Sequence, residues 1–252
     1  MKIIWLSANK LGYELLKEAL KIEDVEIAAV ITLSEKAKTV MYDGVKNKKW
    51  KELGIKTFEI EQINQEKDLI KSLDPDLIIM CGWRQLIDKA ILNVPTQGVI
   101  GFHPTLLPYG RGPAPIINTI QKGRKKSGLT MFYLSEGLDD GDIIGQEEYR
   151  IKKSDHTPDV YKYLIKNGKK LVKQYLPLVI KGKAPRIPQN HEQAILFDKP
   201  SLKNNEIDLE NEDLEAIYNK IRSLSKPYRG AYIKKGNKKL VIWKAELQDI
   251  EQ

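Results

Sequence analysis

The residues best suited to chemistry in this chain gather in one stretch, GFHPTLLPYGRGPAP, residues 101–115. It contains His103, one of only three histidines in 252 residues. The ring follows an apolar run and precedes Pro104, so we expect it at the end of a strand, where a rigid loop begins. An imidazole titrates near neutral pH and is suited to general acid–base catalysis. A loop histidine that only binds a neighbouring carbonyl group is the alternative.

A second candidate is the acidic turn Asp139-Asp140-Gly141-Asp142. Aspartate and glycine are common in tight turns for conformational reasons, so this composition alone does not indicate function. Asp139 follows Leu138 and precedes an apolar strand, and we therefore expect it to be partly buried at a sheet end. A carboxylate in that position can orient an imidazole and raise its basicity. His103 and Asp139 are the candidate acid–base pair.

These residues need a scaffold, and the N-terminal half of the chain alternates between strand and helix patterns. Strand patterns cover residues 2–8, 26–34, 77–83 and 98–104, and helical patterns cover residues 13–22, 67–73 and 85–93, the last of them helical or irregular. This alternation predicts an α/β fold, an open and mostly parallel sheet covered on both faces. Such sheets bind ligands beyond the carboxyl ends of their strands, where Gly82 and His103 are expected.

The second half of the chain continues the domain and then changes character. Strand patterns at residues 129–137 and after the acidic turn precede one long helix or a broken pair over 156–182. A proline-containing polar stretch follows and is predicted to be a linker. The remainder holds an amphipathic helix over 213–224 and two strand-like pieces. We predict a catalytic domain over residues 1–186 and a small C-terminal α+β subdomain over residues 187–252.

The charge, the hydrophobicity and the cysteine count limit the partners and the cellular location expected for this protein. The net charge is +8 with a pI near 9.2, which is compatible with nucleic acid or a phosphorylated small molecule as partner, or with lysines that only cover solvated faces. The apolar runs are too short for a membrane span or a signal peptide. Cys81 is the single cysteine, so no intramolecular disulfide is expected. These features favour a cytoplasmic protein with no membrane partner.

Several common functional motifs are missing. The first turn has Gly12 alone and no G-x-G-x-x-G pattern, which disfavours dinucleotide binding. The sequence has no P-loop, no G-x-S-x-G elbow and no H-E-x-x-H motif. The other histidines, His156 and His191, lie at a predicted helix start and in the predicted linker. No metal site is predicted.

Taken together and in chain order, four segments resemble the folate-dependent formyltransferase family. They are PDLIIMCGWRQLI, GFHPTLLPYGRGPAP, SGLTMFYLSEGLDDGDIIGQ, and IRSLSKPYRGAY followed by KLVIWKAEL. The family's pattern is roughly Asn-x-His-x-Ser/Thr-Leu-Leu-Pro-x-x-Arg-Gly, then Gly-x-Thr, then Leu-Asp-x-Gly-Asp-Ile. The resemblance covers most of the chain. It implies a Rossmann-like core and formyl transfer from 10-formyltetrahydrofolate to a primary amine.

The same resemblance implies roles for individual residues. His103 would stabilise the developing formyl oxyanion or shuttle protons, and Asp139 would orient His103 and help to accept the proton of the amine. The residues expected to bind the cofactor are Trp83, Arg84, Gln85, Leu86, Ile87, Leu138, Asp140, Gly141 and Asp142. The residues expected to bind the acceptor are Thr105, Tyr109 and Arg111. Trp83 is alternatively a core or rim aromatic, and Arg111 is alternatively a structural loop residue.

One position departs from the family's pattern. The family's catalytic asparagine precedes the histidine by two residues, and this chain has Gly101 there. Glycine has no side-chain donor for an oxyanion. Either Asn118, a backbone N–H or a water supplies the missing donor, or the enzyme is weak or its chemistry is altered. We expect a replacement donor or a water, because the other motifs are intact.

The acceptor amine needs a separate argument. The chain ends soon after residues 238–247, before a C-terminal barrel like that of tRNA-modifying members would be complete, and its length resembles the nucleotide-sugar N-formyltransferases. We therefore expect an amino-dideoxy sugar on a nucleoside diphosphate, used for surface glycans such as lipopolysaccharide O-antigen, and a homodimer. The alternatives are another amine such as Met-tRNA, or a non-catalytic folate- or nucleotide-binding protein. The sequence predicts neither the nucleotide nor the sugar.

Overall fold

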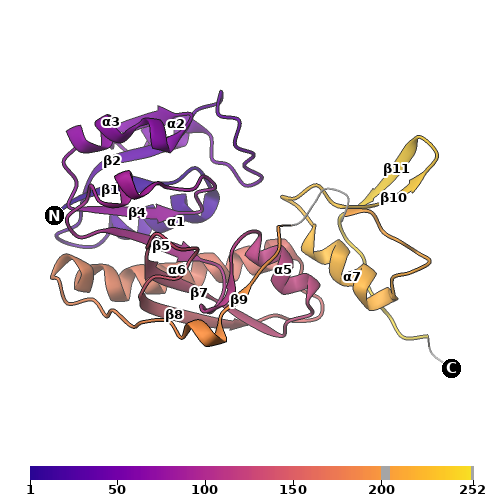
Figure 1. Ribbon diagram of the computed structural model, residues 1–252. Helices are drawn as coiled ribbons and strands as arrows, with labels where there is room; N and C mark the ends of the chain where they lie inside the picture. The colour runs from indigo at the N-terminus through magenta and orange to yellow at the C-terminus, as the bar shows by residue number, and fades with distance from the viewer. Residues whose placement is uncertain (200–204, 251–252) are drawn as a thin grey trace.

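A seven-stranded sheet forms the centre of the computed structural model, which describes residues 1–199 and 205–250. Its strand order is β3-β2-β1-β4-β5-β7-β8 (Figure 1). The strands are β1 Lys2–Leu6, β2 Glu26–Leu33, β3 Thr57–Ile60, β4 Leu77–Cys81, β5 Val99–His103, β7 Lys126–Tyr133 and β8 Ile143–Arg150. From β3 to β5 neighbouring strands are parallel, whereas β5–β7 and β7–β8 are antiparallel. The predicted open, mostly parallel sheet is confirmed.

Helices cover both faces of the sheet. Successive apolar side chains of a strand point to opposite faces, so both faces are apolar. In β1, Ile3 and Trp5 belong to the buried cluster that includes helices α1 (Lys10–Ala19) and α6 (Thr157–Ile180). Ile4 and Leu6 point to the other face and join the cluster of helices α3 (Lys67–Ser72) and α4 (Lys89–Leu92). Side chains of a strand alternate between its two faces, so a strand with four consecutive buried residues serves both clusters.

The sequence patterns located most of these elements but missed several short ones. Strand β3 was missed because it is four residues long and lies at the sheet edge, paired only with β2. The remaining short elements are α2 (Asn47–Lys51), η1 (Ile63–Gln65), β6 (Tyr109–Arg111), α5 (Pro115–Gln121), η2 (His191–Gln193) and β9 (Ile195–Leu196). The long helical pattern is one helix, α6, with Pro177 inside it.

The polar stretch after α6 packs against the part of the chain that forms the seven-stranded sheet. Its β9 pairs in parallel with β6, and Ile187 forms an isolated bridge with Ile143 at the start of β8. Phe197 is buried and meets the ring of Tyr109 edge-on, with centroids 5.5 Å apart. This packing brings a segment distant in sequence up to the loop that follows His103.

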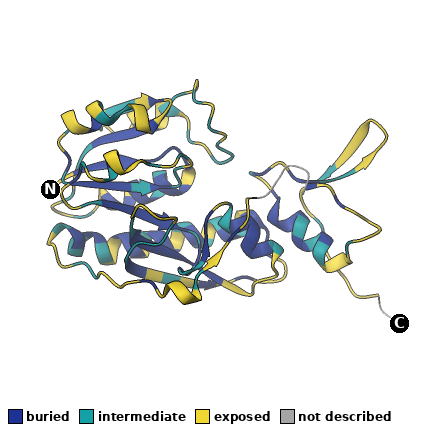
Figure 2. Ribbon diagram, in the orientation of Figure 1, coloured by how far each residue is buried: buried dark blue, intermediate teal, exposed yellow. Residues whose placement is uncertain are grey.

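The C-terminal part contains α7 (Leu214–Ser223) and the antiparallel hairpin of β10 (Ala231–Lys235) and β11 (Lys238–Ile242). Helix α7 lies beside α5 (Figure 1), and their apolar side chains share one cluster. Thr157 Oγ donates to the carbonyl oxygen of Ser223 at 2.7 Å, which ties the end of α7 to the start of α6. The hairpin projects with mostly exposed residues (Figure 2). In the described ranges, no helix has the length and apolarity needed to cross a membrane.

Candidate functional site

His103 is the last residue of β5 and is only 6% exposed. Its Nε2 lies 2.7 Å from the carbonyl oxygen of Gly110. A carbonyl oxygen only accepts hydrogen bonds, so this contact places a proton on Nε2. In the neutral ring the lone pair is then on Nδ1, and Nδ1 is the nitrogen able to take a proton.

Asp139 lies on the Nδ1 side of the ring. Its Oδ2 is 3.4 Å from His103 Nδ1 and accepts a hydrogen bond of 2.9 Å from the backbone N–H of Gly112. Asp139 has a φ of +50°, an uncommon left-handed conformation for a residue with a side chain. The structure thus brings together the two residues that the sequence singled out, and a proton received by Nδ1 would face a carboxylate.

The turn that carries Asp139 connects β7 to β8. The backbone N–H of Tyr133 donates to the carbonyl oxygen of Asp142 at 2.9 Å, and Ser135 Oγ donates to the Asp140 carboxylate. A Cβ at Gly141 would lie 2.0 Å from the Tyr133 carbonyl oxygen, so only glycine fits there. Asp140 and Gly141 therefore have a clear role in shaping the turn, whatever they contribute to a ligand.

Gly101 lies in the middle of β5, and apolar side chains fill the space beside it. A Cβ built there would be 2.4 Å from Leu134 Cδ1 and 3.1 Å from Phe132 Cε1. The proposed replacement donor Asn118 is not supported. Its Nδ2 is within 3.1–3.2 Å of the carbonyl oxygens of Pro113, Ala114 and Asp198, so both of its N–H groups are engaged.

The predicted cofactor loop after β4 is held by its own polar side chains. Gln85 Oε1 accepts from the Ile63 N–H at 2.9 Å, and Gln85 Nε2 donates to the carbonyl oxygen of Glu61 at 2.7 Å. Asn64 bonds the Leu86 carbonyl oxygen and the Asp88 N–H. The Gln85 side chain thus fastens the loop, and any contribution it makes to cofactor binding would come from its backbone.

The two predicted cofactor segments lie next to each other and offer an apolar surface. Lys89 Nζ and Glu136 Oε1 form an ion pair of 2.6 Å that bridges them. Leu86 is 81% exposed and Leu138 48% exposed, one on each segment. Strand β7 is antiparallel to β5, so the turn after β7 leaves the sheet beside the start of β5 and reaches His103 through Asp139. Exposed leucines fit the apolar faces of a flat ring system such as a pterin.

Trp83 and Ile87 pack against the apolar cluster beneath the sheet. The Trp83 Nε1 is buried without a hydrogen-bond partner among the described residues. This position favours the role of a core or rim aromatic for Trp83. Asp142 carries its carboxylate 4.0 Å from the guanidinium of Arg186.

The three residues predicted to bind the acceptor are differently placed. Thr105 is 1% exposed, and its carbonyl oxygen accepts from Thr130 Oγ at 2.7 Å. Tyr109 is half-buried, with the guanidinium carbon of Arg124 4.6 Å from its ring centroid. Arg111 is 6% exposed and donates to the Gln189 side chain through Nε and Nη2. Its surroundings favour the structural alternative for Arg111.

Gln189 is a residue of this site that the sequence did not reveal. Its Nε2 donates to the carbonyl oxygens of Asp139 and Gly141 at 2.9 and 2.7 Å. It stands in a polar stretch that reads as a linker, and no motif marks it.

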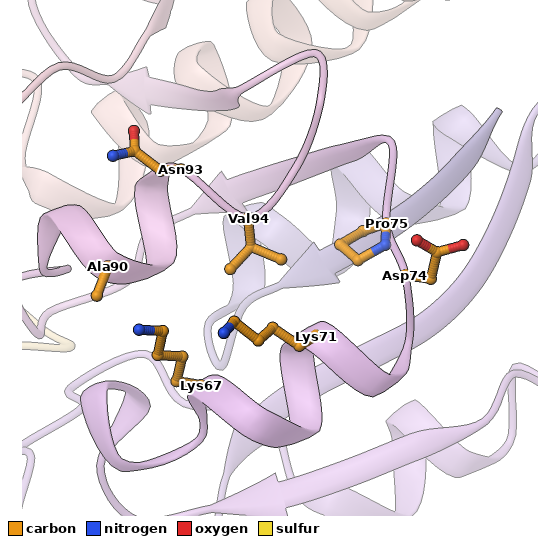
Figure 3. Close-up of a pocket in the computed structure, with 7 residues that line it drawn as sticks. All are labelled: Lys67, Lys71, Asp74, Pro75, Ala90, Asn93 and Val94. Carbon is orange, nitrogen blue, oxygen red and sulfur yellow. The ribbon is translucent and has the colours of Figure 1, made fainter.

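A hollow of about 490 Å³ lies between α3 and α4 (Figure 3). Its lining residues are Lys67, Lys71, Asp74, Pro75, Ala90, Asn93 and Val94. Asp74 and Pro75 precede β4, so this hollow is at the amino end of that strand, away from His103. No predicted site residue lines it.

The sheet has the strand arrangement of a Rossmann-like formyltransferase. Sequence comparison identifies the family. Residues 1–176 match formyl transferase, and residues 201–252 match the formyl transferase C-terminal domain. The chain belongs to the formyl transferase family.

Individual relatives differ in their acceptors. The chain is 36% identical over 187 residues to the methionyl-tRNA formyltransferase of Carboxydothermus hydrogenoformans, a match that covers 74% of this chain and 59% of that protein. A 4-N formyltransferase from Francisella tularensis superposes with a TM-score of 0.77 at 25% identity, covering 99% and 98% of the two chains. WlaRD, a sugar 3N-formyl transferase solved in the presence of dTDP and 5-N-formyl-THF, shares the fold with a TM-score of 0.70 at 20% identity, covering 88% and 78%.

Proposed function

We propose that this chain transfers a formyl group from 10-formyltetrahydrofolate to the amine of a nucleotide-linked amino-dideoxy sugar. The observation that carries the chemistry is the pairing of His103 Nδ1 with Asp139 Oδ2 at 3.4 Å. Family membership supports formyl transfer, and the Francisella tularensis 4-N formyltransferase, matched over almost the full length of both chains, supports a sugar acceptor.

The hydrogen-bond pattern favours proton transfer over oxyanion binding as the role of His103. The Nε2 proton is engaged by Gly110, so it is not available to a formyl oxygen while that bond persists. The Nδ1 lone pair is free to take the proton that the acceptor amine loses as its nitrogen bonds to the formyl carbon. Asp139 then stabilises the resulting imidazolium, as carboxylates do in other histidine-based sites. When bound, the formyl-folate would supply the electrophilic formyl carbon, and its bond from that carbon to the folate nitrogen would break, with the nitrogen leaving as the protonated amine of tetrahydrofolate.

A cationic cluster around Tyr42 supports an acceptor that carries phosphate. The guanidinium carbons of Arg84 and Arg229 lie 5.0 and 5.9 Å from the Tyr42 ring centroid. Both arginines are exposed, and within the described residues neither has a carboxylate at ion-pair distance. Asp43 lies near Arg84, but burial raises the pKa of its carboxyl group and so weakens it as a counter-ion. Guanidinium groups bind phosphates in bidentate geometry, which suits a nucleoside diphosphate.

Met-tRNA is the second candidate acceptor, because the Carboxydothermus hydrogenoformans relative is a methionyl-tRNA formyltransferase. The test is direct. Purified protein would be mixed with 10-formyltetrahydrofolate and a panel of thymidine- and guanosine-linked 3-amino and 4-amino sugars, with Met-tRNA alongside, and products weighed by mass spectrometry. The added mass of one formyl group on a sugar nucleotide supports the proposal. Formylation of Met-tRNA and of no sugar nucleotide would replace it with the second candidate. Folate binding without any formylated product would support a non-catalytic protein.

The arginine cluster gives a separate prediction. Arg84→Gln and Arg229→Gln are each expected to raise the KM for the acceptor by a factor of about 10 to 150, since a charge-assisted hydrogen bond contributes about 1.5–3 kcal/mol, and to change kcat little. Steady-state kinetics with the acceptor identified by the panel would measure this. Arg150→Gln, at the exposed end of β8, is the matched control. An unchanged KM in both variants would show that the acceptor's phosphates bind elsewhere.

We also propose that the protein works in the cytoplasm as a homodimer and that its product is used for surface glycans. A mass measured by light scattering on the purified chain would decide the oligomeric state. A monomeric mass at assay concentration would overturn the dimer.

A further inference from the structure

The amide of Gln189 makes four hydrogen bonds while being 5% exposed. Its oxygen accepts from Arg111 Nε and Nη2 at 3.0 and 2.8 Å. Its nitrogen donates to the carbonyl oxygens of Asp139 and Gly141 at 2.9 and 2.7 Å. A primary amide has two N–H donors and one oxygen with two lone pairs, so all of its capacity is used. Such a fully satisfied buried group fixes the parts it joins.

Gln189 supports Asp139 in two ways, through the Asp139 backbone and through the loop whose N–H group binds the Asp139 carboxylate. The backbone of Asp139 has a φ of +50°, a conformation that costs about 1–2 kcal/mol for a residue with a side chain and needs support from its surroundings. Gln189 bonds that backbone directly. The Asp139 carboxylate is held by the N–H of Gly112, and Gln189 bonds the side chain of the neighbouring residue, Arg111.

Arg111 makes the arrangement sensitive to charge. Its guanidinium is buried, and within the described part of the chain no carboxylate lies at ion-pair distance from it. The neutral oxygen of Gln189 is its main acceptor, with His191 Nδ1 at 3.4 Å. A glutamate at position 189 would suit Arg111 at least as well. It would have no N–H for the carbonyl oxygens of Asp139 and Gly141, so the native amide is needed for the turn.

We infer that Gln189 is a positioning residue for the formyl transfer, holding the Asp139 carboxylate at its place beside His103 Nδ1. This inference rests on the proposed function, because it assigns Asp139 a part in the chemistry. Gln189 itself touches neither the reacting atoms nor, on this geometry, the acceptor. Its effect on the reaction passes through the Asp139–Gly141 turn.

The variant Gln189→Glu separates the two halves of the amide. It keeps the acceptor for Arg111 and removes both donors to the turn. We expect kcat to fall by about a hundredfold, the cost of a misplaced catalytic group, with KM for the acceptor unchanged, because Gln189 does not touch the acceptor. Gln193→Glu is the matched control, with the same change of charge at an exposed position in the same segment. In an Asp139→Asn background, Gln189→Glu should have no further effect beyond about twofold, because the carboxylate it positions is already absent.

A structural readout distinguishes failure of this inference from failure of the proposed function. Hydrogen exchange of the Gly112 N–H, which donates to Asp139 Oδ2, should accelerate in Gln189→Glu and stay unchanged in Gln193→Glu, whether or not the protein turns over. If the wild-type protein formylated no acceptor, the proposed function would be overturned, but the exchange rate of the Gly112 N–H would still test whether Gln189 holds the turn. If Gln189→Glu kept the kcat and the Gly112 exchange rate of the wild-type protein, the positioning role would be overturned. It would also be overturned if Gln189→Glu lowered kcat as much in the Asp139→Asn background as it does alone. Should Gln189→Glu not fold, Arg111→Met/Gln189→Met removes the buried cation with its amide and carries the same expectations.

Discussion

His103→Ala and Asp139→Asn are each expected to lower kcat for formyl transfer by a factor of about 10²–10⁴, the usual contribution of a positioned acid–base group. His103→Ala removes the Nδ1 lone pair that is placed to take the amine proton. Asp139→Asn keeps the side chain's shape and can still accept from Gly112, but it removes the charge that stabilises protonated Nδ1. Single-turnover assays with the formylated product measured by mass spectrometry would give both values.

The stability of these two variants is the internal check. His103 and Asp139 lie at the end of the sheet rather than inside either main apolar cluster, so thermal unfolding should be close to that of wild type. Asp74→Asn, which removes an exposed carboxylate beside Lys2 at the opposite end of the sheet, controls for the loss of a negative charge. Near wild-type turnover in either His103→Ala or Asp139→Asn would contradict the proton-transfer role.

The parts of this molecule that were predictable from sequence are those set by local patterns. Buried strands such as β1 and β4 are short apolar runs, and their positions follow from composition alone. His103 and Asp139 were predictable as a pair from their residue types and motifs. Because β5 and β7 are antiparallel, the end of β7 lies beside the start of β5, so strand order alone does not bring them together. Their residue types and their family motifs pointed to the same chemistry.

The parts that were not predictable depend on contacts between distant segments. Gln189 and Arg111 are 78 residues apart, and neither carries a local signal that it is buried. An arginine in a Gly-rich loop suggests a ligand contact, yet here it is enclosed by the segment after α6. Likewise, the sequence shows that Gly101 lacks an amide but not that Leu134 and Phe132 occupy its place.

Gly101→Asn is expected to lower the thermal stability of the protein and not to raise its rate of formyl transfer. The new Cβ would meet Leu134 Cδ1 at 2.4 Å and Phe132 Cε1 at 3.1 Å, inside a β5 that is buried along its whole length. Overpacking of this kind costs about 1–3 kcal/mol, and it should appear as a thermal midpoint lowered by roughly 2–4 °C per kcal/mol. An Asn variant as stable as wild type and faster would show that the two side chains yield easily and that the missing amide limits the rate.

Combining Gly101→Asn with Leu134→Ala separates the effect of the new amide on catalysis from its effect on packing. Removing the Leu134 side chain clears the closest contact, so the pair should recover part of the stability that Gly101→Asn loses, with Leu134→Ala alone as the reference. If the amide can then reach a developing oxyanion, kcat should rise above that of Leu134→Ala, because such a donor contributes about 10²–10³ in rate where an active site uses one. We expect little rise. The apolar filling beside Gly101 and the free lone pair of Nδ1 support the proposed mechanism, in which His103 takes the amine proton and no side-chain amide binds the formyl oxygen. A large rise would instead show that oxyanion stabilisation, not proton transfer, limits the reaction.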